Sequence, residues 1–135
     1  MKKVIIAGGR DFNNYTFLKS VLEAHFSEPI IVVSGGAQGA DSLGERYANE
    51  KGYEVERHPA NWKDINAKPC SIKYNQYGAY NALAGHNRNR EMLNSIIENE
   101  DGGEVIAFWN GVSKGTENMI KISKEASIKT TVIYY

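Results

Sequence analysis

The sequence predicts an α/β fold, a three-layer α/β/α sandwich around a mainly parallel sheet of about five strands. Short apolar runs alternate with longer segments whose apolar residues have helical spacing, the order expected of such a sandwich. The runs show no polar alternation, which is typical of parallel strands buried on both faces. Glycine-rich turns follow three of the runs, where a strand would lead into a helix. A chain of 135 residues fits one domain, so we expect a single unit over residues 1–135.

The first half of the chain contains five expected elements. Apolar runs at residues 4–7 and 30–33 are predicted to be buried strands. Apolar residues at helical spacing predict a helix over 13–26, with an asparagine cap near its start, and a helix over 39–51, which a glycine ends. Residues 53–57 alternate apolar and polar side chains, so we predict a more exposed strand there.

The second half contains two further helices and two further strands. Helical spacing predicts a helix that starts close to Arg88 and breaks at a glycine pair near residue 102. It also predicts a last helix through residues 119–126. The apolar and β-branched runs at 105–109 and 130–134 are predicted to be strands.

Residues 58–84 interrupt this alternation. The segment has no clear periodicity and carries prolines, a tryptophan and several tyrosines. A loop this long in a compact domain is usually a lid, an interface or a mobile insertion. Its aromatic content favours an ordered lid or interface insertion over a disordered surface excursion.

The amino-acid composition limits the classes of partner and cofactor that we expect. Lys plus Arg and Asp plus Glu balance at 16 each, so no overall field attracts nucleic acid or an anionic membrane, although a local basic patch is compatible with this balance. No apolar stretch approaches the roughly 20 residues of a membrane span, so we expect no membrane partner. Cys70 is the only cysteine, which suits a cytoplasmic location. The three histidines lie far apart, so we expect no metal, and no other cofactor is indicated.

The three glycine turns form the candidate binding site. Ligands of open parallel sheets bind at the carboxyl ends of the strands, where glycine allows close backbone approach and helix N-termini attract anions. The turns therefore predict a site for an anionic ligand, most simply a nucleotide or sugar phosphate. The candidate ligand-binding residues in the turns are Gly8, Gly9, Arg10 and Asp11, then Ser34, Gly35, Gly36, Ala37, Gly39 and Ala40, and finally Asn110, Gly111, Ser113, Lys114, Gly115 and Thr116.

Several charged and polar side chains in the turns have either a structural or a ligand-binding interpretation. Arg10 can make bidentate hydrogen bonds to a phosphate or carboxylate, whereas for Asp11 a structural ion pair with Arg10 is favoured. Asp41 either caps its helix or accepts hydrogen bonds from a ribose hydroxyl. Ser113 or Thr116 can cap the last helix. The third turn matches neither the spacing of a Walker A loop nor a GxGxxG fingerprint, so ATP hydrolysis has no support there.

Charged residues near the later helices complete the candidate set. Arg88 and Arg90 are predicted to lie in the first turn of a helix, where positive charge opposes the helix dipole and so suggests anion binding. An ion pair of Arg88 with Glu91 is the alternative. Glu117 is either a general acid/base or a residue favoured at a helix start. We further expect Glu45 to be solvated or ion-paired and His86 to be an exposed loop residue.

Four motifs in order resemble the YspA-like branch (DUF2493) of the SLOG superfamily. They lie at residues 6–12, 34–41, 88–92 and 114–119, and the resemblance covers nearly the whole chain. It implies a Rossmann-like fold and a nucleotide or nucleotide-derived ligand across the glycine turns. The superfamily includes the LOG phosphoribohydrolases and the single-stranded DNA-binding protein DprA.

The resemblance to LOG enzymes implies a hydrolytic mechanism with named residues. These enzymes cleave the bond between a base and ribose 5′-monophosphate, using a PGGxGTxxE motif and an earlier arginine. Gly115 and Thr116 match the GT, and Arg88 or Arg90 matches the arginine. The chain lacks the PGG, and Glu117 comes earlier than the LOG glutamate. In this reading Arg88 and Arg90 hold phosphate, Asp41 fixes ribose, and Glu117 assists departure of the base.

Binding of a nucleotide or nucleotide-derived small molecule is therefore the leading function, in a sensor, a sequestering protein or an N-glycosidic hydrolase. Because Glu117 comes earlier in the chain than the LOG glutamate, binding without robust catalysis is favoured. The alternative is DprA-like binding of single-stranded DNA, which needs a basic groove with stacking aromatics. Neutral charge and small size count against nucleic acid as the partner. Related enzymes often dimerise, so a homo-oligomer is expected. The DNA groove, or else a dimer interface, would involve Lys68, Lys73, Tyr74, Tyr77 and Tyr80.

Overall fold

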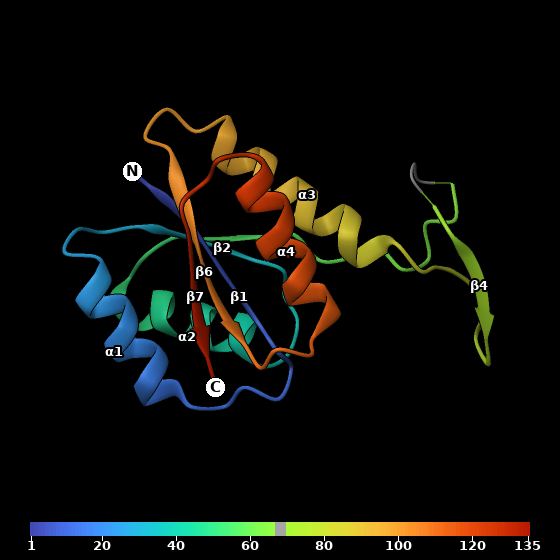
Figure 1. Cartoon of the computed structure of the whole chain (residues 1–135), viewed down its shortest axis with the longest axis horizontal. Coiled ribbons are helices and arrows are strands. Elements are labelled where there is room, and N and C mark those ends of the chain that lie inside the picture. The colour runs from blue at the N-terminus through green and yellow to red at the C-terminus, as the bar shows by residue number, and fades with distance from the viewer. Residues whose placement is uncertain (67–69) are drawn as a thin grey trace.

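The computed structural model describes residues 1–66 and 70–135. Strands and helices alternate as the sequence predicts, except for an added hairpin (Figure 1). Lys68 lies outside the described residues. The elements in order are β1 (Lys3–Gly8), α1 (Tyr15–His25), β2 (Ile31–Ser34), α2 (Ala40–Lys51), β3 (Val55–Arg57), β4 (Ile72–Asn75), β5 (Gly78–Asn81), α3 (Ala84–Ile97), β6 (Gly103–Trp109), α4 (Lys114–Glu125) and β7 (Thr130–Tyr134).

The main sheet has five parallel strands in the order β3-β2-β1-β6-β7. Its strand residues alternate between two cores, so that Val4 and Ile6 pack against α1 and α2. Ile5 and Ala7 face the opposite core, which α3 and α4 cover. Figure 1 shows these two helix pairs on opposite faces of the sheet. The predicted three-layer α/β/α sandwich is therefore confirmed, and its architecture is Rossmann-like.

The order of the strands reverses between β1 and β6. From β1 the chain builds outward through β2 and β3, and it then returns to pair β6 along the other side of β1. The register of this central pair runs to Gly8 opposite Phe108, so β1 and β6 end at the same edge of the sheet. Such a switch point opens a crevice at the carboxyl ends of the strands.

Helix ends match the expected signals in the first half and differ at α3. The side chain of Asn14 accepts a hydrogen bond from Phe17 N at 3.1 Å and caps α1, while Gly52 ends α2 in the left-handed conformation. Helix α3 starts at Ala84. Arg88 and Arg90 therefore lie beyond the first turn, and the prediction that they oppose the helix dipole there was wrong. Residues 84–87 lack apolar periodicity, which concealed the true start.

The segment over 58–84 contains an antiparallel hairpin, β4–β5, which projects from the body of the protein (Figure 1). Tyr74 and Tyr77 on this hairpin are 78% and 88% exposed. These two strands were not predicted from the sequence. Because β4 is exposed throughout and the buried residue of β5 is the polar Asn81, the hairpin carries no hydrophobic alternation strong enough to reveal it.

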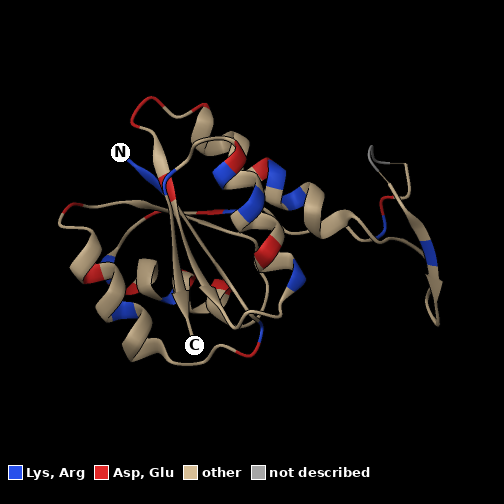
Figure 2. Ribbon diagram, in the orientation of Figure 1, with Lys and Arg blue, Asp and Glu red and all other residues tan. Residues whose placement is uncertain are grey.

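Basic and acidic residues occur together along the helices, without segregation to one part of the fold (Figure 2). Within residues 1–66 and 70–135, no helix combines the length and apolar character required to cross a membrane. The same described residues contain no group of three or more His, Cys, Asp or Glu side chains placed to hold a metal ion.

Candidate functional site

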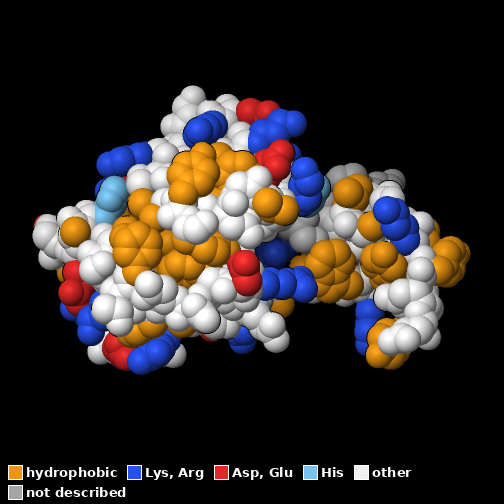
Figure 3. Space-filling model, turned by 60° about the horizontal axis from the view of Figure 1, so that its bottom comes forward, with side chains coloured by type: hydrophobic (Ala, Val, Ile, Leu, Met, Phe, Trp, Pro, Cys, Tyr) orange, Lys and Arg blue, Asp and Glu red, His pale blue; other side chains and the backbone are white. Residues whose placement is uncertain are grey.

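A cleft of about 480 Å³ lies at the edge of the sheet where β1 and β6 end. Figure 3 shows this hollow beside the projecting segment, with basic side chains at its mouth. Its volume falls in the range of small-molecule sites. The sequence-predicted site residues that line it are Gly8, Gly9, Arg10, Asp11, Ala37, Asp41, Arg88, Asn110, Ser113, Gly115 and Thr116.

Other predicted site residues lie outside the lining of this cleft. They are Ser34, Gly35, Gly36, Gly39, Ala40, Arg90, Gly111, Lys114 and Glu117. The structure also adds lining residues that the sequence analysis did not select as site residues, namely Ala7, Trp62, Ala82, Gly85, His86, Asn89, Met92 and Met119.

The first and second glycine turns pack directly on each other. Ala40 N, at the start of α2, donates to Gly9 O at 3.3 Å. Gly39 has a positive φ of 79°, and a Cβ atom there would collide with Gly9 O and lie 2.7 Å from Arg10 Cα. Glycine is therefore required by both conformation and space. The N-terminus of α2 is partly closed by the first turn, rather than being fully open to a ligand.

Further N–H groups of the second turn are also used within the protein. Gly36 N donates to Ser34 Oγ at 3.0 Å, and Ala37 N donates to Asp41 Oδ2 at 3.2 Å. Asp41 therefore folds back onto the turn, and it does not serve as the N-cap of α2, which is Gly39. Within residues 37–40, the N–H groups of Ala37 and Ala40 are therefore occupied.

Arg88 joins α3 to the second turn. Its Nη1 donates to Gly35 O at 2.7 Å and its Nε donates to Asn89 Oδ1 at 3.1 Å. A Cβ atom on Gly35 would collide with Nη1 and lie 2.8 Å from Asp41 Oδ2, so the side chains of Arg88 and Asp41 flank this glycine. The alternative pair with Glu91 does not form, and Glu91 Oε2 instead lies 3.7 Å from His58 Nδ1.

The charges of Asp41, which is buried, and Arg88, which is half-buried, affect each other's pKa. Burial raises the pKa of Asp41 above its ordinary value, and the hydrogen bond from Ala37 together with the positive charges of Arg88 and Arg10 opposes this rise. Burial likewise lowers the pKa of Arg88, while the charge of Asp41 opposes the decrease. The cleft thus contains a carboxyl group that binds its proton more tightly than usual.

Asn89 connects α3 with the start of α4. It is buried, and its Nδ2 donates to Gly115 O and to Asn118 Oδ1, both at 3.1 Å. Its Oδ1 accepts the bond from Arg88. This one amide therefore fixes the position of the third turn relative to the arginine. Its place between two arginines was visible in the sequence, but its partners were not.

The third turn leaves donors available to a ligand. Asn110 Oδ1 accepts from Val112 N at 2.8 Å and Ser113 N at 2.9 Å, which shapes the turn. Ser113 is the N-cap residue of α4, but its Oγ lies 3.1 Å from Thr116 Oγ1 and makes no capping bond. Across the part of the chain that is described, the N–H groups of residues 114–116 have no protein acceptor. Since Gly115 and Thr116 line the cleft, their N–H groups adjoin it.

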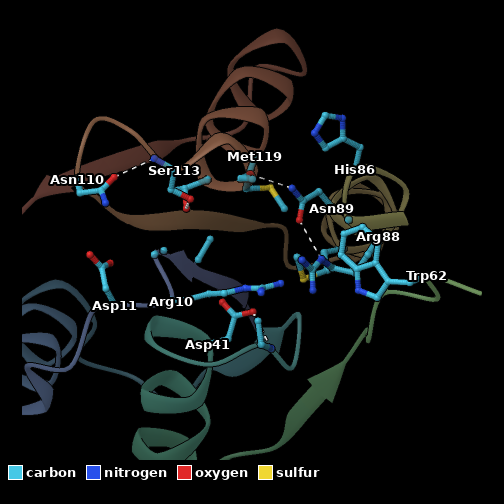
Figure 4. Close-up of a pocket in the computed structure, with 18 of the residues that line it drawn as sticks. Arg10, Asp11, Asp41, Trp62, His86, Arg88, Asn89, Asn110, Ser113 and Met119 are labelled. Carbon is cyan, nitrogen blue, oxygen red and sulfur yellow. Dashed lines mark hydrogen bonds between the residues drawn. The ribbon is translucent and has the colours of Figure 1, made fainter. Parts of the chain in front are cut away.

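The first turn contributes Arg10 and Asp11 in different ways. Figure 4 shows Arg10 extending across the cleft toward Asp41. Asp11 Oδ1 accepts a 2.5 Å hydrogen bond from the hydroxyl of Tyr135. The favoured Arg10–Asp11 pair is not among the ion pairs of the described residues, so that expectation was wrong. Burial and this bond to Asp11 raise the pKa of Tyr135 to about 12.

Trp62 and His86 lie at the end of the cleft opposite Asn110 (Figure 4). Trp62 is 41% exposed. His86 is exposed as expected, but it belongs to α3 and not to a loop. An isolated tryptophan in a polar segment was the only sequence signal for this wall of the cleft.

The acidic residues outside the cleft have structural partners. Glu117 is half-exposed and lies 3.7 Å from Lys114 Nζ. Glu45 accepts from Ser34 Oγ at 2.7 Å and pairs with Arg57 Nε at 3.2 Å, which confirms the expected ion pair. Arg90 is exposed on α3. Among the lining residues, the carboxyl groups come from Asp11 and Asp41.

Comparison with known proteins agrees with this architecture. The model of the YspA, cpYpsA-related SLOG family matches residues 2–64, which contain the first two glycine turns. Gene 61 protein of Mycobacterium phage D29 is 31% identical over 137 residues, an alignment that covers 95% of this chain and 93% of that protein. Because the match in the first half and the relative along nearly the full length agree with the fold, this chain belongs to the YspA, cpYpsA-related SLOG family.

Proposed function

We propose that the cleft binds a nucleotide or a nucleotide-derived small molecule through its phosphate group. The observation that carries this proposal is the pair of N–H groups of Gly115 and Thr116, two residues that line the cleft and whose N–H groups have no protein acceptor among the described residues. A helix N-terminus with free donors favours an anion, and Arg10 and Arg88 add positive charge to the same cleft. Family membership supports a nucleotide-related ligand.

The donors of the third turn, with Arg10, are the proposed phosphate site. Arg10 is exposed, extends into the cleft, and has no ion-pair partner within the described ranges, so it can reorient onto a phosphate. Arg88 has a different proposed role, because its Nη1 and Nε already hold Gly35 and Asn89. It positions the second turn and contributes charge. Arg90 has no part in the proposed site, since it lies outside the cleft.

Asp41 is the proposed partner of the ribose. It lines the cleft, and a carboxyl oxygen is the acceptor that a sugar hydroxyl requires. Because Glu117 lies outside the cleft, it is not part of the proposed site. A protein with these features would act as a sensor or a sequestering protein for its nucleotide.

One observation favours N-glycosidic hydrolysis as the second candidate function. The raised pKa of buried Asp41 is the property of a general acid. Its proton would pass to the base as the bond between base and ribose breaks. A water molecule would add to the sugar carbon and return a proton to Asp41. Release of free base from a bound nucleotide, lost in Asp41→Asn, would establish this activity.

Thermal stability against a panel of nucleoside mono-, di- and triphosphates, cyclic nucleotides, NAD and ADP-ribose tests the binding proposal. A ligand at 100 times its dissociation constant stabilises a native protein by about 2.7 kcal/mol, so we expect a clear increase in Tm. No shift with the whole panel at millimolar concentration would refute it. A single-stranded oligonucleotide, measured at two salt concentrations, would then test the DNA-binding alternative.

A further inference from the structure

The two ends of the cleft differ in chemistry. Near Asn110 and Ser113 the lining also contains Gly115 and Thr116, whose N–H groups have no protein acceptor among the described residues. The other end contains the indole of Trp62, with His86 and Arg88 beside it (Figure 4), and the apolar groups of Ala82 and Met92 are also in the lining. Figure 4 shows Trp62 at the opposite side of the cleft from Asn110 and Ser113. An anionic group and a flat apolar group of one ligand would thus find separate partners.

Trp62 is held in place although its side chain is partly exposed. Its carbonyl oxygen accepts a hydrogen bond from Asn81 N at 2.6 Å, which anchors the backbone to the end of β5. Its ring lies against Gly85 on α3, where a Cβ atom would be 3.3 Å from Trp62 Cη2. Absence of a side chain at residue 85 lets the indole approach the helix closely. With 41% of its surface exposed, the ring still has area available for a ligand.

We propose that Trp62 stacks on the base of the bound nucleotide and makes the cleft selective for base-containing ligands over simple sugar phosphates. This inference rests on the proposed function. Stacking on an aromatic side chain requires a planar π-face, which a nucleobase has and a ribose phosphate lacks. Purines present more area than pyrimidines and therefore bind more tightly.

The test compares AMP with ribose 5-phosphate in calorimetric titrations of wild-type protein, Trp62→Ala and Trp62→Phe. We expect Trp62→Ala to lose about tenfold or more in affinity for AMP and to keep its affinity for ribose 5-phosphate. Trp62→Phe, which retains an aromatic face, should recover much of the AMP affinity. Equal losses for both ligands in Trp62→Ala, or no loss for AMP, would overturn the role of Trp62.

Two outcomes in the wild-type protein separate this inference from the proposed function. If neither AMP nor ribose 5-phosphate binds, while other nucleotides also fail, the proposed function is wrong and the inference fails with it. If both bind with equal affinity, the phosphate site stands and base selection by Trp62 is refuted.

Fluorescence gives a readout that a merely structural role would not produce. The chain has two tryptophans, and Trp109 donates from Nε1 to Ser113 O at 3.0 Å and packs beside Tyr134. Stacking of AMP on Trp62 should quench emission in the wild type, and this component should be absent in Trp62→Phe. Ribose 5-phosphate should leave the emission unchanged. Quenching by AMP that persists undiminished in Trp62→Phe would contradict stacking on Trp62.

Discussion

Arg88 Nη1 donates a 2.7 Å hydrogen bond to the carbonyl oxygen of Gly35, 53 residues earlier in the chain. This contact brings a guanidinium from α3 against the second glycine turn, at the side of Asp41. Gly35 does not have a positive φ. It is glycine because a Cβ atom would occupy the space of the guanidinium. The contact therefore explains one residue of the glycine motif by tertiary packing.

Gly35→Ala should destabilise the protein. The added Cβ atom would collide with Arg88 and lie 2.8 Å from Asp41 Oδ2, so either the turn or the arginine must move. Overpacking of this kind costs about 1–3 kcal/mol. Urea unfolding of the variant and the wild type measures the change. An unaltered free energy of unfolding would mean that the guanidinium moves aside without cost.

Gly115→Ala is expected to increase the stability of the protein and to weaken nucleotide binding. An added Cβ atom at Gly115 meets no atom within 4 Å, and the residue lies in α4, where alanine is favoured by about 0.5–1 kcal/mol. The free energy of unfolding should therefore increase. The same methyl group would stand beside the proposed phosphate site, so nucleotide affinity should fall. Urea unfolding and nucleotide titration of one preparation test both effects, and unchanged affinity would argue against a phosphate at this turn.

Arg10→Ala should weaken phosphate binding by about tenfold or more, since a hydrogen bond to a charged group is lost. Arg90→Ala is the matched comparison, because Arg90 is exposed and lies outside the cleft. We expect it to bind the nucleotide like the wild type. Titrations at low and moderate salt measure both variants. Equal weakening would indicate a general charge effect and not a contact made by Arg10.

Asp41→Asn should stabilise the unliganded protein at neutral pH. Since burial raises the pKa of Asp41, ionisation of this group costs free energy in the folded state, and stability decreases as the pH rises through that pKa. Asparagine resembles the protonated form and avoids the cost. The gain should shrink at acidic pH, below the ordinary pKa of an aspartate, where the group is protonated in both states. Unfolding curves at several pH values test this, and a variant less stable at pH 7 would contradict it.

Glu56→Gln should remove part of the acid sensitivity of the fold. Burial tends to raise the pKa of Glu56, but the hydrogen bonds with His58, Lys3 and Ser95 outweigh it and lower the pKa to about 2. Glu56 therefore contributes stability above the ordinary glutamate pKa of 4.5, and this contribution is lost as the pH falls toward 2.

The measurement for Glu56 is the difference in unfolding free energy between wild type and Glu56→Gln from pH 7 to pH 2. We expect the variant to be about 1–3 kcal/mol less stable at pH 7, because charge-assisted bonds are lost. The two curves should converge toward pH 2. Parallel curves would show that the carboxylate is not the titrating group.

Local sequence was sufficient for most of the secondary structure and for the family. Buried parallel strands must be apolar on both faces, so runs such as 4–7 and 105–109 were recognisable without their neighbours. Asn14 and Gly52 mark helix ends through bonds and dihedral angles within a few residues. The hairpin β4–β5 and the start of α3 were missed because they have little buried apolar surface to produce a pattern.

The tertiary structure decided which groups remain available for a ligand. The sequence placed all three glycine turns at one edge of the sheet, but Gly9 O of the first turn occupies Ala40 N of the second. Only the fold could bring Trp62 to the cleft and leave Glu117 outside it. The physical reason is that a hydrogen-bond donor is free or occupied according to contacts between residues far apart in the chain, and no local pattern records them.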